Sequence, residues 1–168
     1  MSELSYSAAD IETALSVVSA AREIEWTWHL EDADRVCARL GWQLRATERY
    51  GLLAATGAAV NAPEARFTFF GGGIGIVTVN VTDMLDKDVS NRVTVVDNWF
   101  QSLTGPLTTE LGVPEREKPA PLAAALWAPT PSMWVHLSAL DRSVKLRIAS
   151  PEYQEYQDAA EIAFGRSR

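Results

Sequence analysis

The residues with side chains suited to catalysis are two histidines, one cysteine and a few acidic clusters. His29 follows a tryptophan, and His136 falls in a β-rich stretch. A zinc site needs further ligands at defined spacing, and a histidine-activated nucleophile needs a serine or cysteine held beside the ring in the fold. No such spacing is present, so the sequence predicts no catalytic residue and no metal site. The expected role of both histidines is packing or solvation.

Residues 71–75 hold four glycines and resemble a phosphate-binding loop only in that richness. A nucleotide loop follows a strand and leads into a helix N-terminus, usually with a lysine and a hydroxyl residue. Here a second β-rich stretch follows, and no lysine is present. The glycines therefore predict a bend or bulge in a sheet, and no cofactor is expected.

The acidic residues Asp83, Asp86 and Asp88 form the densest local charge in the middle of the chain. Their spacing departs from the alternate-residue order and central glycine of an EF-hand loop. Two interpretations remain: a solvated turn that caps the next helix, or an acidic ridge that meets basic groups of a partner protein. Glu115 and Glu117, in a charged and proline-rich connector, are predicted as partner-binding residues together with this ridge.

The single cysteine, Cys37, lies in the apolar stripe of a predicted helix over residues 33–40. A small buried side chain is the favoured role, ahead of a nucleophile. One cysteine excludes an internal disulfide and a thiolate cluster for zinc. Among the six tryptophans, most are expected in the core, while one or two could anchor an interface, where tryptophan is enriched.

Composition is that of an ordinary folded protein, with 47% hydrophobic and 22% charged residues. A chain of 168 residues fits one α+β domain over residues 1–168 and buries roughly 70% of its unfolded surface. The net charge of −7 disfavours nucleic acid and anionic membranes as partners and favours a basic protein. Because neither a membrane-length apolar run nor a signal peptide is present, we expect a cytoplasmic protein.

Residues 67–82 carry the densest run of β-branched and aromatic side chains, and they predict a hairpin at the centre of a sheet. Within its second arm, Val77, Val79 and Val81 alternate with polar residues and define the covered face. One strand is expected within residues 42–56 and an exposed loop over residues 113–121. Three more strands are expected over residues 124–128, 132–139 and 143–149.

Four helices are expected to pack on this sheet. The first begins at the Ser7-x-x-Asp10 pattern, in which a hydroxyl caps the helix, and the second ends at Gly41. A helix over residues 91–111 should be kinked or divided at Gly105-Pro106. Serine and proline at residues 150 and 151 predict the start of the last helix. The predicted fold class is α+β, with a mostly antiparallel sheet of about six strands in two meanders and with N-terminal, central and C-terminal helices.

Several short motifs together resemble an actinobacterial family of unknown function whose members are similar to immunity proteins of polymorphic or type VII-secreted toxins. They are Leu40-Gly41-Trp42, a helix with Asp97 and Phe100 that ends in residues 111–114, the isolated Trp127, and residues 150–153 before a final helix. The resemblance implies a cytoplasmic protein that binds and inhibits the catalytic domain of a toxin, either an NAD-degrading enzyme or a nuclease. It implies no active-site residue in this chain.

Two other classes of function stay open. The order of helices and strands is similar to that of type III secretion chaperones, which predicts a homodimer that binds an extended segment. A small-molecule-binding protein or enzyme would need a pocket lined with convergent polar groups. The immunity hypothesis instead predicts a monomer or homodimer bound to a cognate toxin domain.

Overall fold

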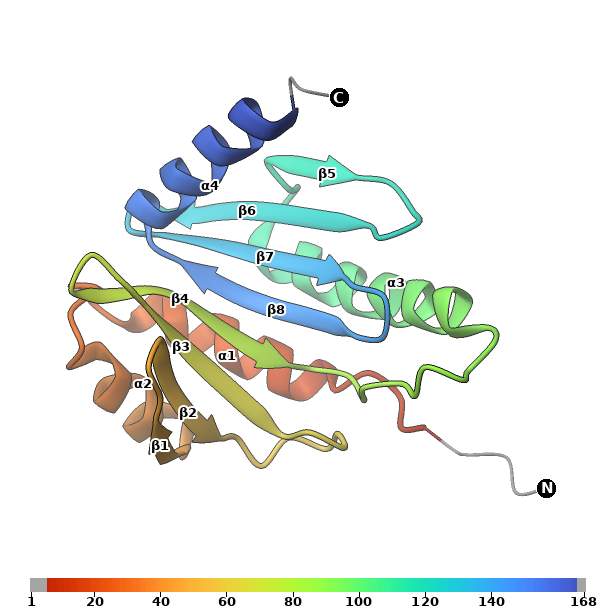
Figure 1. Cartoon of the computed structure of the whole chain (residues 1–168), viewed down its shortest axis with the longest axis horizontal. Helices are drawn as coiled ribbons and strands as arrows, with labels where there is room; N and C mark the ends of the chain where they lie inside the picture. Colours follow the sequence, from red (N-terminus) through yellow and green to blue (C-terminus); the bar gives the residue numbers. More distant parts are fainter. Residues whose placement is uncertain (1–5, 166–168) are drawn as a thin grey trace.

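The computed structural model describes residues 6–165, which form four helices and one eight-stranded sheet (Figure 1). The first half of the chain comprises helices α1 (Ile11–Glu23) and α2 (Asp32–Leu40), then strands β1 (Gln43–Thr47), β2 (Gly51–Ala55), β3 (Glu64–Phe70) and β4 (Gly73–Asn80). The second half comprises α3 (Arg92–Leu111), β5 (Arg116–Lys118), β6 (Ala124–Thr130), β7 (Met133–Ala139), β8 (Val144–Ala149) and α4 (Pro151–Gly165).

The sheet is antiparallel throughout, with the strand order β1-β2-β3-β4-β8-β7-β6-β5. Helix followed by a four-stranded meander therefore occurs twice, and the last strands of the two meanders, β4 and β8, pair at the centre. Their register runs from Ile76 opposite Ala149 to Asn80 opposite Lys145. The predicted α+β class with two meanders is confirmed, as is the central position of the second arm of the hairpin.

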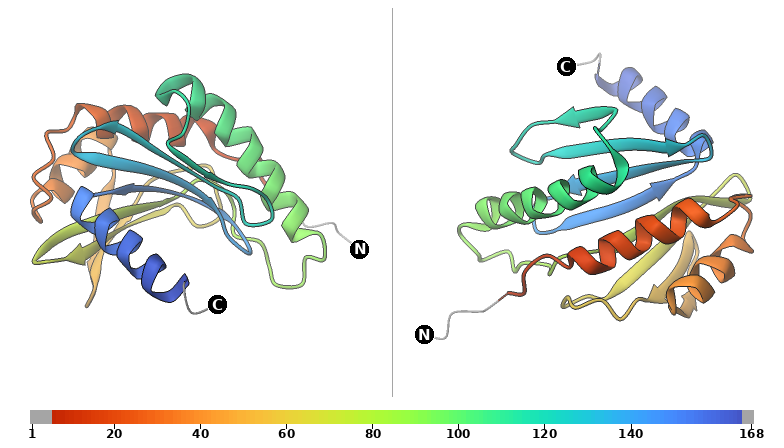
Figure 2. Two further views of the ribbon diagram at one scale, coloured as in Figure 1. Left: turned by 90° about the horizontal axis from the view of Figure 1, so that it is seen from above. Right: turned by 180° about the vertical axis from the view of Figure 1, so that it is seen from behind.

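One face of the sheet, called here the inner face, is apolar and covered by helices. Figure 2 shows α1 and α3 side by side against this face. The face carries Val77, Val79, Ile148 and Val135, each no more than 1% exposed. Burial of such side chains is the main favourable term in folding, and the predicted valine face is confirmed as the covered one.

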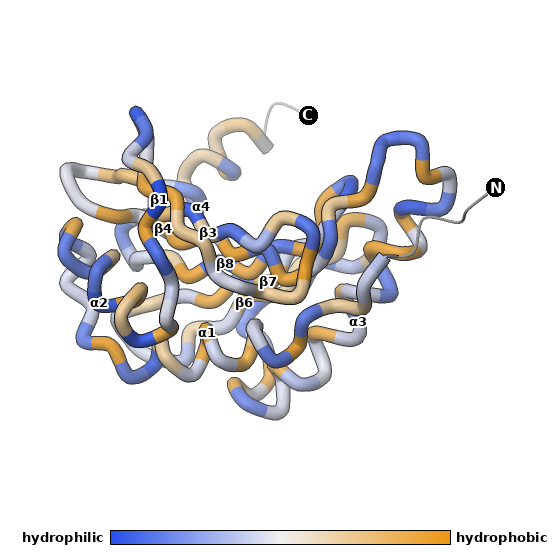
Figure 3. The backbone as a smooth tube through the Cα atoms, turned by 90° about the horizontal axis from the view of Figure 1, so that it is seen from below, coloured by the Kyte–Doolittle hydropathy of each residue, from blue (hydrophilic) through white to orange (hydrophobic). Residues whose placement is uncertain are grey.

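The opposite face, called the outer face, contacts α4 (Figure 2). In Figure 3 the labels of α1, α2 and α3 lie on one side of the strands and α4 lies on the other, while hydrophobic and hydrophilic colours alternate along the strands. A polar row crosses the outer face through paired positions, from Arg66 through Thr78 and Arg147 to His136. The alternation of a strand thus separates a dry face from a polar one.

The sheet has eight strands, so the expectation of about six was wrong in two places. Residues 42–56 form a hairpin, β1 and β2, with its turn at residues 48–50 rather than at Gly51. Gly51 is the first residue of β2, where a Cβ would overlap the carbonyl oxygen of Phe67. The expected loop over residues 113–121 contains the short edge strand β5, which pairs with β6 through Arg116, Glu117 and Lys118.

The helices also differ in detail from the prediction. Asp10, not Ser7, caps α1, because its carboxylate accepts hydrogen bonds from Thr13 N at 2.9 Å and from the Thr13 hydroxyl at 2.7 Å. Helix α3 continues through Pro106 to Leu111 without division. Gly41 ends α2 with φ of 70°, as predicted. Within the described residues, no helix combines the length and apolar character needed to cross a bilayer.

Candidate functional site

The acidic ridge predicted for partner binding is divided between interior and surface. Asp83 is only 4% exposed, and its carboxylate accepts hydrogen bonds from the backbone of Ser7 and Asn61, both at 2.7 Å. It therefore ties the N-terminal segment and the loop before β3 to the end of β4. Asp86 and Asp88 are exposed, and the Tyr6 hydroxyl donates to Asp86 at 3.2 Å.

Glu115 and Glu117 are exposed beside and within the edge strand β5. Four strand spacings, roughly 19 Å, separate β5 from β4, the strand that precedes the ridge. The structure therefore does not bring the two predicted acidic groups together into one surface. Their role in binding a partner stays a prediction.

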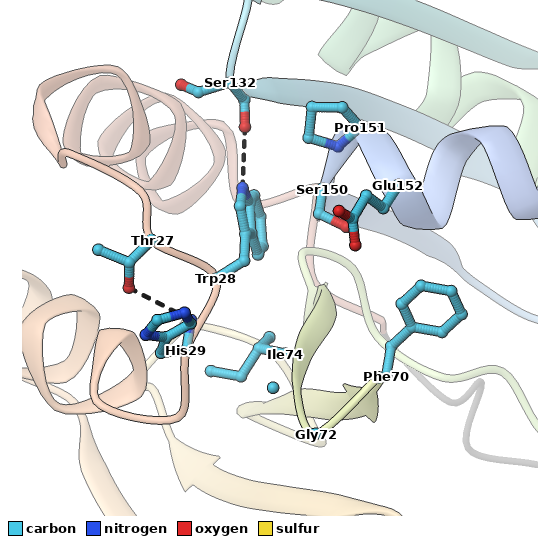
Figure 4. Close-up of a pocket in the computed structure, with 12 residues that line it drawn as sticks. Thr27, Trp28, His29, Phe70, Gly72, Ile74, Ser132, Ser150, Pro151 and Glu152 are labelled. Atoms are coloured by element: carbon cyan, nitrogen blue, oxygen red, sulfur yellow. Dashed lines mark hydrogen bonds between the residues drawn. The ribbon is translucent and has the colours of Figure 1, made fainter.

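A pocket of about 710 Å³ opens at the end of the sheet, and we call it the end pocket (Figure 4). Four segments meet there: residues 27–29 between α1 and α2, the glycine turn between β3 and β4, the turn before β7, and the start of α4. Trp28, Phe70 and Glu152 are among its lining residues and come from three of these segments. The pocket thus depends on the tertiary fold.

Trp28 is fixed in this pocket by contacts from every side. Its backbone N–H donates to the buried carboxylate of Asp32 at 2.7 Å, and its indole N–H donates to the carbonyl of Ser132 at 2.9 Å. Its carbonyl accepts from Ile74 N at 2.9 Å, and its ring stacks on Trp26 with centroids 4.2 Å apart. These contacts hold Trp28 at φ of 58°, an uncommon conformation for a residue with a side chain.

The glycines of residues 71–75 shape the end pocket and its surroundings, as a bend rather than a phosphate loop. Gly71 and Gly72 form the turn with φ of 59° and 80°. A Cβ at Gly73 would overlap the carbonyl oxygen of Trp28. At Gly75, a Cβ would lie 2.6 Å from Phe70 Cβ and 2.7 Å from Tyr153 Cδ2, so glycine here lets α4 approach the sheet.

Polar groups around the end pocket serve the local structure. The Ser150 hydroxyl accepts from Tyr153 N at 3.0 Å and caps α4 as predicted. The backbone N–H of His29 donates to the Thr27 hydroxyl at 3.2 Å. Among the described residues, no hydrogen bond joins His29 to a serine hydroxyl. Glu152 is exposed, and no described residue forms a hydrogen bond or ion pair with its carboxylate.

A second cavity, of about 600 Å³, lies between α4 and the polar row of the outer face, and we call it the outer groove. Aromatic contacts dock α4 beside it: Phe70 meets Tyr153 edge-on with centroids 5.3 Å apart, and Tyr156 at 5.5 Å. Tyr153 also lines the groove, with Arg147, His136 and Gln154. The groove meets the condition of convergent polar groups that a ligand-binding protein requires.

Charged groups in the outer groove are unevenly paired. Arg116 forms a bidentate pair with Asp158 at 2.7 and 3.1 Å, which raises the pKa of Arg116 and lowers the pKa of Asp158. Arg147 is half-buried and makes no hydrogen bond or ion pair with any described residue. Burial lowers the pKa of Arg147, and the nearby Tyr153 opposes that shift.

The buried side chains of His136 and Gln154 lie next to each other in the groove. Burial lowers the pKa of His136 to about 4, an effect that its side-chain hydrogen bond with Gln154 opposes and Arg147 reinforces. The imidazole is therefore neutral at pH 7. Gln154 is 4% exposed and donates its amide N–H to Asp158 at 2.9 Å, so it connects the imidazole of His136 to the ion pair of Arg116 and Asp158.

The remaining candidates for chemistry are accounted for by packing. Cys37 is 7% exposed in the core, as predicted, and burial together with Asp34 raises the pKa of its thiol to about 11. Such a thiol is a poor nucleophile at pH 7. Within residues 6–165, no group of three or more histidine, cysteine, aspartate or glutamate side chains could hold a metal ion.

A family model described as a family of unknown function, DUF6301, matches residues 12–150. The chain belongs to the DUF6301 family. The DUF6301 match spans α1 to β8 and ends where α4 begins, so it includes Arg147 and His136 but not Tyr153 or Gln154. No curated protein and no solved structure gives a significant match.

Sequence reasoning missed the outer groove in this DUF6301 chain. Sequence patterns predict only a packed or solvated His136 and a strand over residues 143–149. The available signal was the register of the last hairpin: two antiparallel strands joined at residues 140–142 place residues 136 and 147 opposite each other. The position of α4 above them could not be read from spacing.

Proposed function

We propose that this protein is an immunity-type inhibitor, which binds the catalytic domain of a secreted toxin in the cytoplasm and blocks it. The toxin is either an NAD-degrading enzyme or a nuclease, as the resemblance to actinobacterial immunity proteins implies. The end pocket is the contact site, and a basic side chain of the toxin domain is its occupant.

The observation that carries the proposal is the fixed aromatic and acidic lining of the end pocket. Hot spots of protein interfaces are anchor residues that enter well-formed pockets, and aromatic residues are enriched there. Trp28 is held by hydrogen bonds and stacking before any partner binds. Rigid contact residues lose little entropy on association, which favours tight binding.

Charge supports a basic anchor. Glu152 faces the pocket without a partner among the described residues, between the rings of Trp28 and Phe70 in the view of Figure 4. A lysine or arginine there would gain both an ion pair and cation–π contacts. The net charge of −7 would also accelerate the encounter with a basic domain. Exposed Asp86 and Asp88 add to that field.

The experiment is co-expression with each toxin gene that neighbours this one, followed by isolation of the complex. The wild-type chain should rescue growth against one toxin and form a complex with one toxin domain bound to each chain. Glu152→Lys should abolish rescue, because it places a like charge beside the basic anchor. Glu155→Lys is the matched control, since Glu155 is exposed on the same helix but lines neither cavity.

Loss of rescue in both variants would mean that the charge of α4, rather than the end pocket, matters. Absence of rescue by the wild type against every adjacent toxin would remove the immunity proposal. A strict homodimer that captures only extended segments would instead favour the secretion chaperone.

A further inference from the structure

A third cavity adjoins the end pocket, and we call it the corner cavity. It has a volume of about 460 Å³ and lies between the start of α2 and the strands β1, β2 and β3. Its lining combines apolar side chains with two carboxylates, and these residues are Leu30, Ala33, Leu52 and Phe69, with Glu31 and Asp34. The corner cavity thus offers an apolar floor beside negative charge.

The apolar floor of the corner cavity is open to solvent. Leu30 is 48% exposed, and Leu52 and Phe69 are only partly buried. Phe67, two residues earlier on β3, is by contrast fully buried in the core. Covering open apolar side chains is favourable, and interfaces place apolar and aromatic anchors in pockets of this kind. The floor therefore suits an apolar side chain of a partner.

The charge of the corner cavity favours a basic residue next to that apolar one. Glu31 pairs with Arg35 at 3.7 Å. Asp34 is exposed, and its carboxylate forms no hydrogen bond or ion pair with any described residue. Arg49 lies over the ring of Tyr50 in the turn between β1 and β2 and does not line the cavity. A lysine or arginine of a partner would therefore pair with Asp34.

The corner cavity and the end pocket are built by the same two segments. Residues 27–29 line the end pocket, and residues that directly follow them line the corner cavity. On β3, Phe70 lines the end pocket and its neighbour Phe69 lines the corner cavity. The two segments cross where the backbone N–H of Ile74 donates to the carbonyl of Trp28 at 2.9 Å. A folded domain seated on the end pocket therefore also reaches the corner cavity.

We infer that the corner cavity is a second anchor site, which takes an apolar side chain of a protein partner and pairs the adjacent lysine or arginine with Asp34. One partner domain fills both the end pocket and the corner cavity. The inference rests on the proposed function only for the identity of that partner as a toxin domain.

The first test is NMR titration of the full chain with three blocked dipeptides: acetyl-Leu-Lys-amide, acetyl-Leu-Gln-amide and acetyl-Gly-Lys-amide. Acetyl-Leu-Lys-amide should shift the amide signals of Leu30, Ala33 and Leu52. Its affinity, measured from these signals, should exceed that of the other two, because only this dipeptide has both the apolar and the basic side chain. Equal affinities, or no saturable shift of these signals, would overturn the inference.

Two variants with matched controls assign the site. Asp34→Asn should weaken acetyl-Leu-Lys-amide about threefold and remove its advantage over acetyl-Leu-Gln-amide, because an exposed ion pair is lost. Asp88→Asn is its control, since Asp88 is exposed and lines neither cavity. Leu30→Ser should weaken both leucine peptides about fivefold. Leu44→Ser, at a leucine of similar exposure outside both cavities, should not. Equal losses in a variant and its control would overturn the site.

The second test separates this inference from the proposed function. In the complex with the toxin that the wild-type chain neutralises, Leu30→Ser should raise the Kd about tenfold, while Leu44→Ser leaves it unchanged. If Glu152→Lys abolishes rescue and Leu30→Ser keeps full affinity, the end pocket stands and the inference fails. If the wild-type chain rescues against no adjacent toxin, the proposed function fails, and the dipeptide titration still decides the corner cavity.

Discussion

The two faces of the sheet are made by the same strands and have opposite properties. On the inner face, Phe67, Val77 and Ile148 are at most 1% exposed and belong to one hydrophobic core with buried residues of α1 and α3. On the outer face, their sequence neighbours Thr68, Thr78 and Arg147 line a groove under α4. The inner face therefore supplies stability, whereas the outer face is left polar at a cost that binding can offset.

The largest expected effect comes from truncating the inner face. Phe67→Ala should lower the free energy of unfolding by about 3–5 kcal/mol, because it empties a site packed edge-on against Trp42. The adjacent outer-face change Arg66→Ala should cost no more than about 1 kcal/mol, since its ion pair with Glu48 is exposed. Urea denaturation of both variants measures the difference, and equal losses would contradict the division of roles.

The next largest effect is a pH dependence that originates on the outer face. His136 has its pKa lowered from 6.5 to about 4, so between these values the unfolded chain binds a proton that the folded chain does not. Stability is therefore lost as pH falls from about 6.5 to about 4, by up to about 3 kcal/mol. His136→Gln should remove this part of the loss. Denaturation at a series of pH values compares the two slopes, and parallel slopes would show that the ring is solvated.

The packing of α4 against the sheet depends on the absence of a side chain at Gly75. Gly75→Ala should cost about 1–3 kcal/mol, because the added methyl group would displace Phe70 or Tyr153. Thermal unfolding should show a lower midpoint for Gly75→Ala than for the wild-type chain. A neutral Gly75→Ala would mean that α4 docks more loosely than the structure shows.

The smallest effect concerns the ion pair between Arg116 and Asp158 in the outer groove. Asp158→Asn should lower stability by no more than about 1 kcal/mol, because the pair with Arg116 is partly exposed and screened by salt. Since the pKa of Asp158 is lowered in the fold, its contribution is present above the ordinary aspartate range and is lost as pH falls through the folded value. Urea denaturation at low and high salt should show a loss that shrinks as salt rises.

How much the sequence could predict follows from the range of the interactions. Alternation with a period of two identified the valine face of β4, because it depends only on neighbouring residues. Asp83 was expected on the surface, yet it is buried by Ser7 and Asn61, which are 76 and 22 residues away. An aspartate gives the same signal in the sequence whether water or backbone N–H groups surround its carboxylate.

The candidate sites were harder to predict than the fold for the same reason. The end pocket requires Trp28, Phe70 and Glu152 to meet from distant segments. The outer groove requires a helix to cross strands that follow one another by short turns. Neither the end pocket nor the outer groove places its residues at a fixed spacing in the sequence, so neither can be recognised as a motif.

The central pairing of β4 with β8 has a consequence for synthesis of the chain. Strand β4 lies between β3 and β8, and β8 ends only at Ala149. While the ribosome is still making the intervening residues, the hydrogen-bonding edge of β4 is open, and it belongs to a strand rich in valine and isoleucine. An open apolar edge invites pairing with other chains. The nascent protein thus remains prone to aggregation until its last strand emerges.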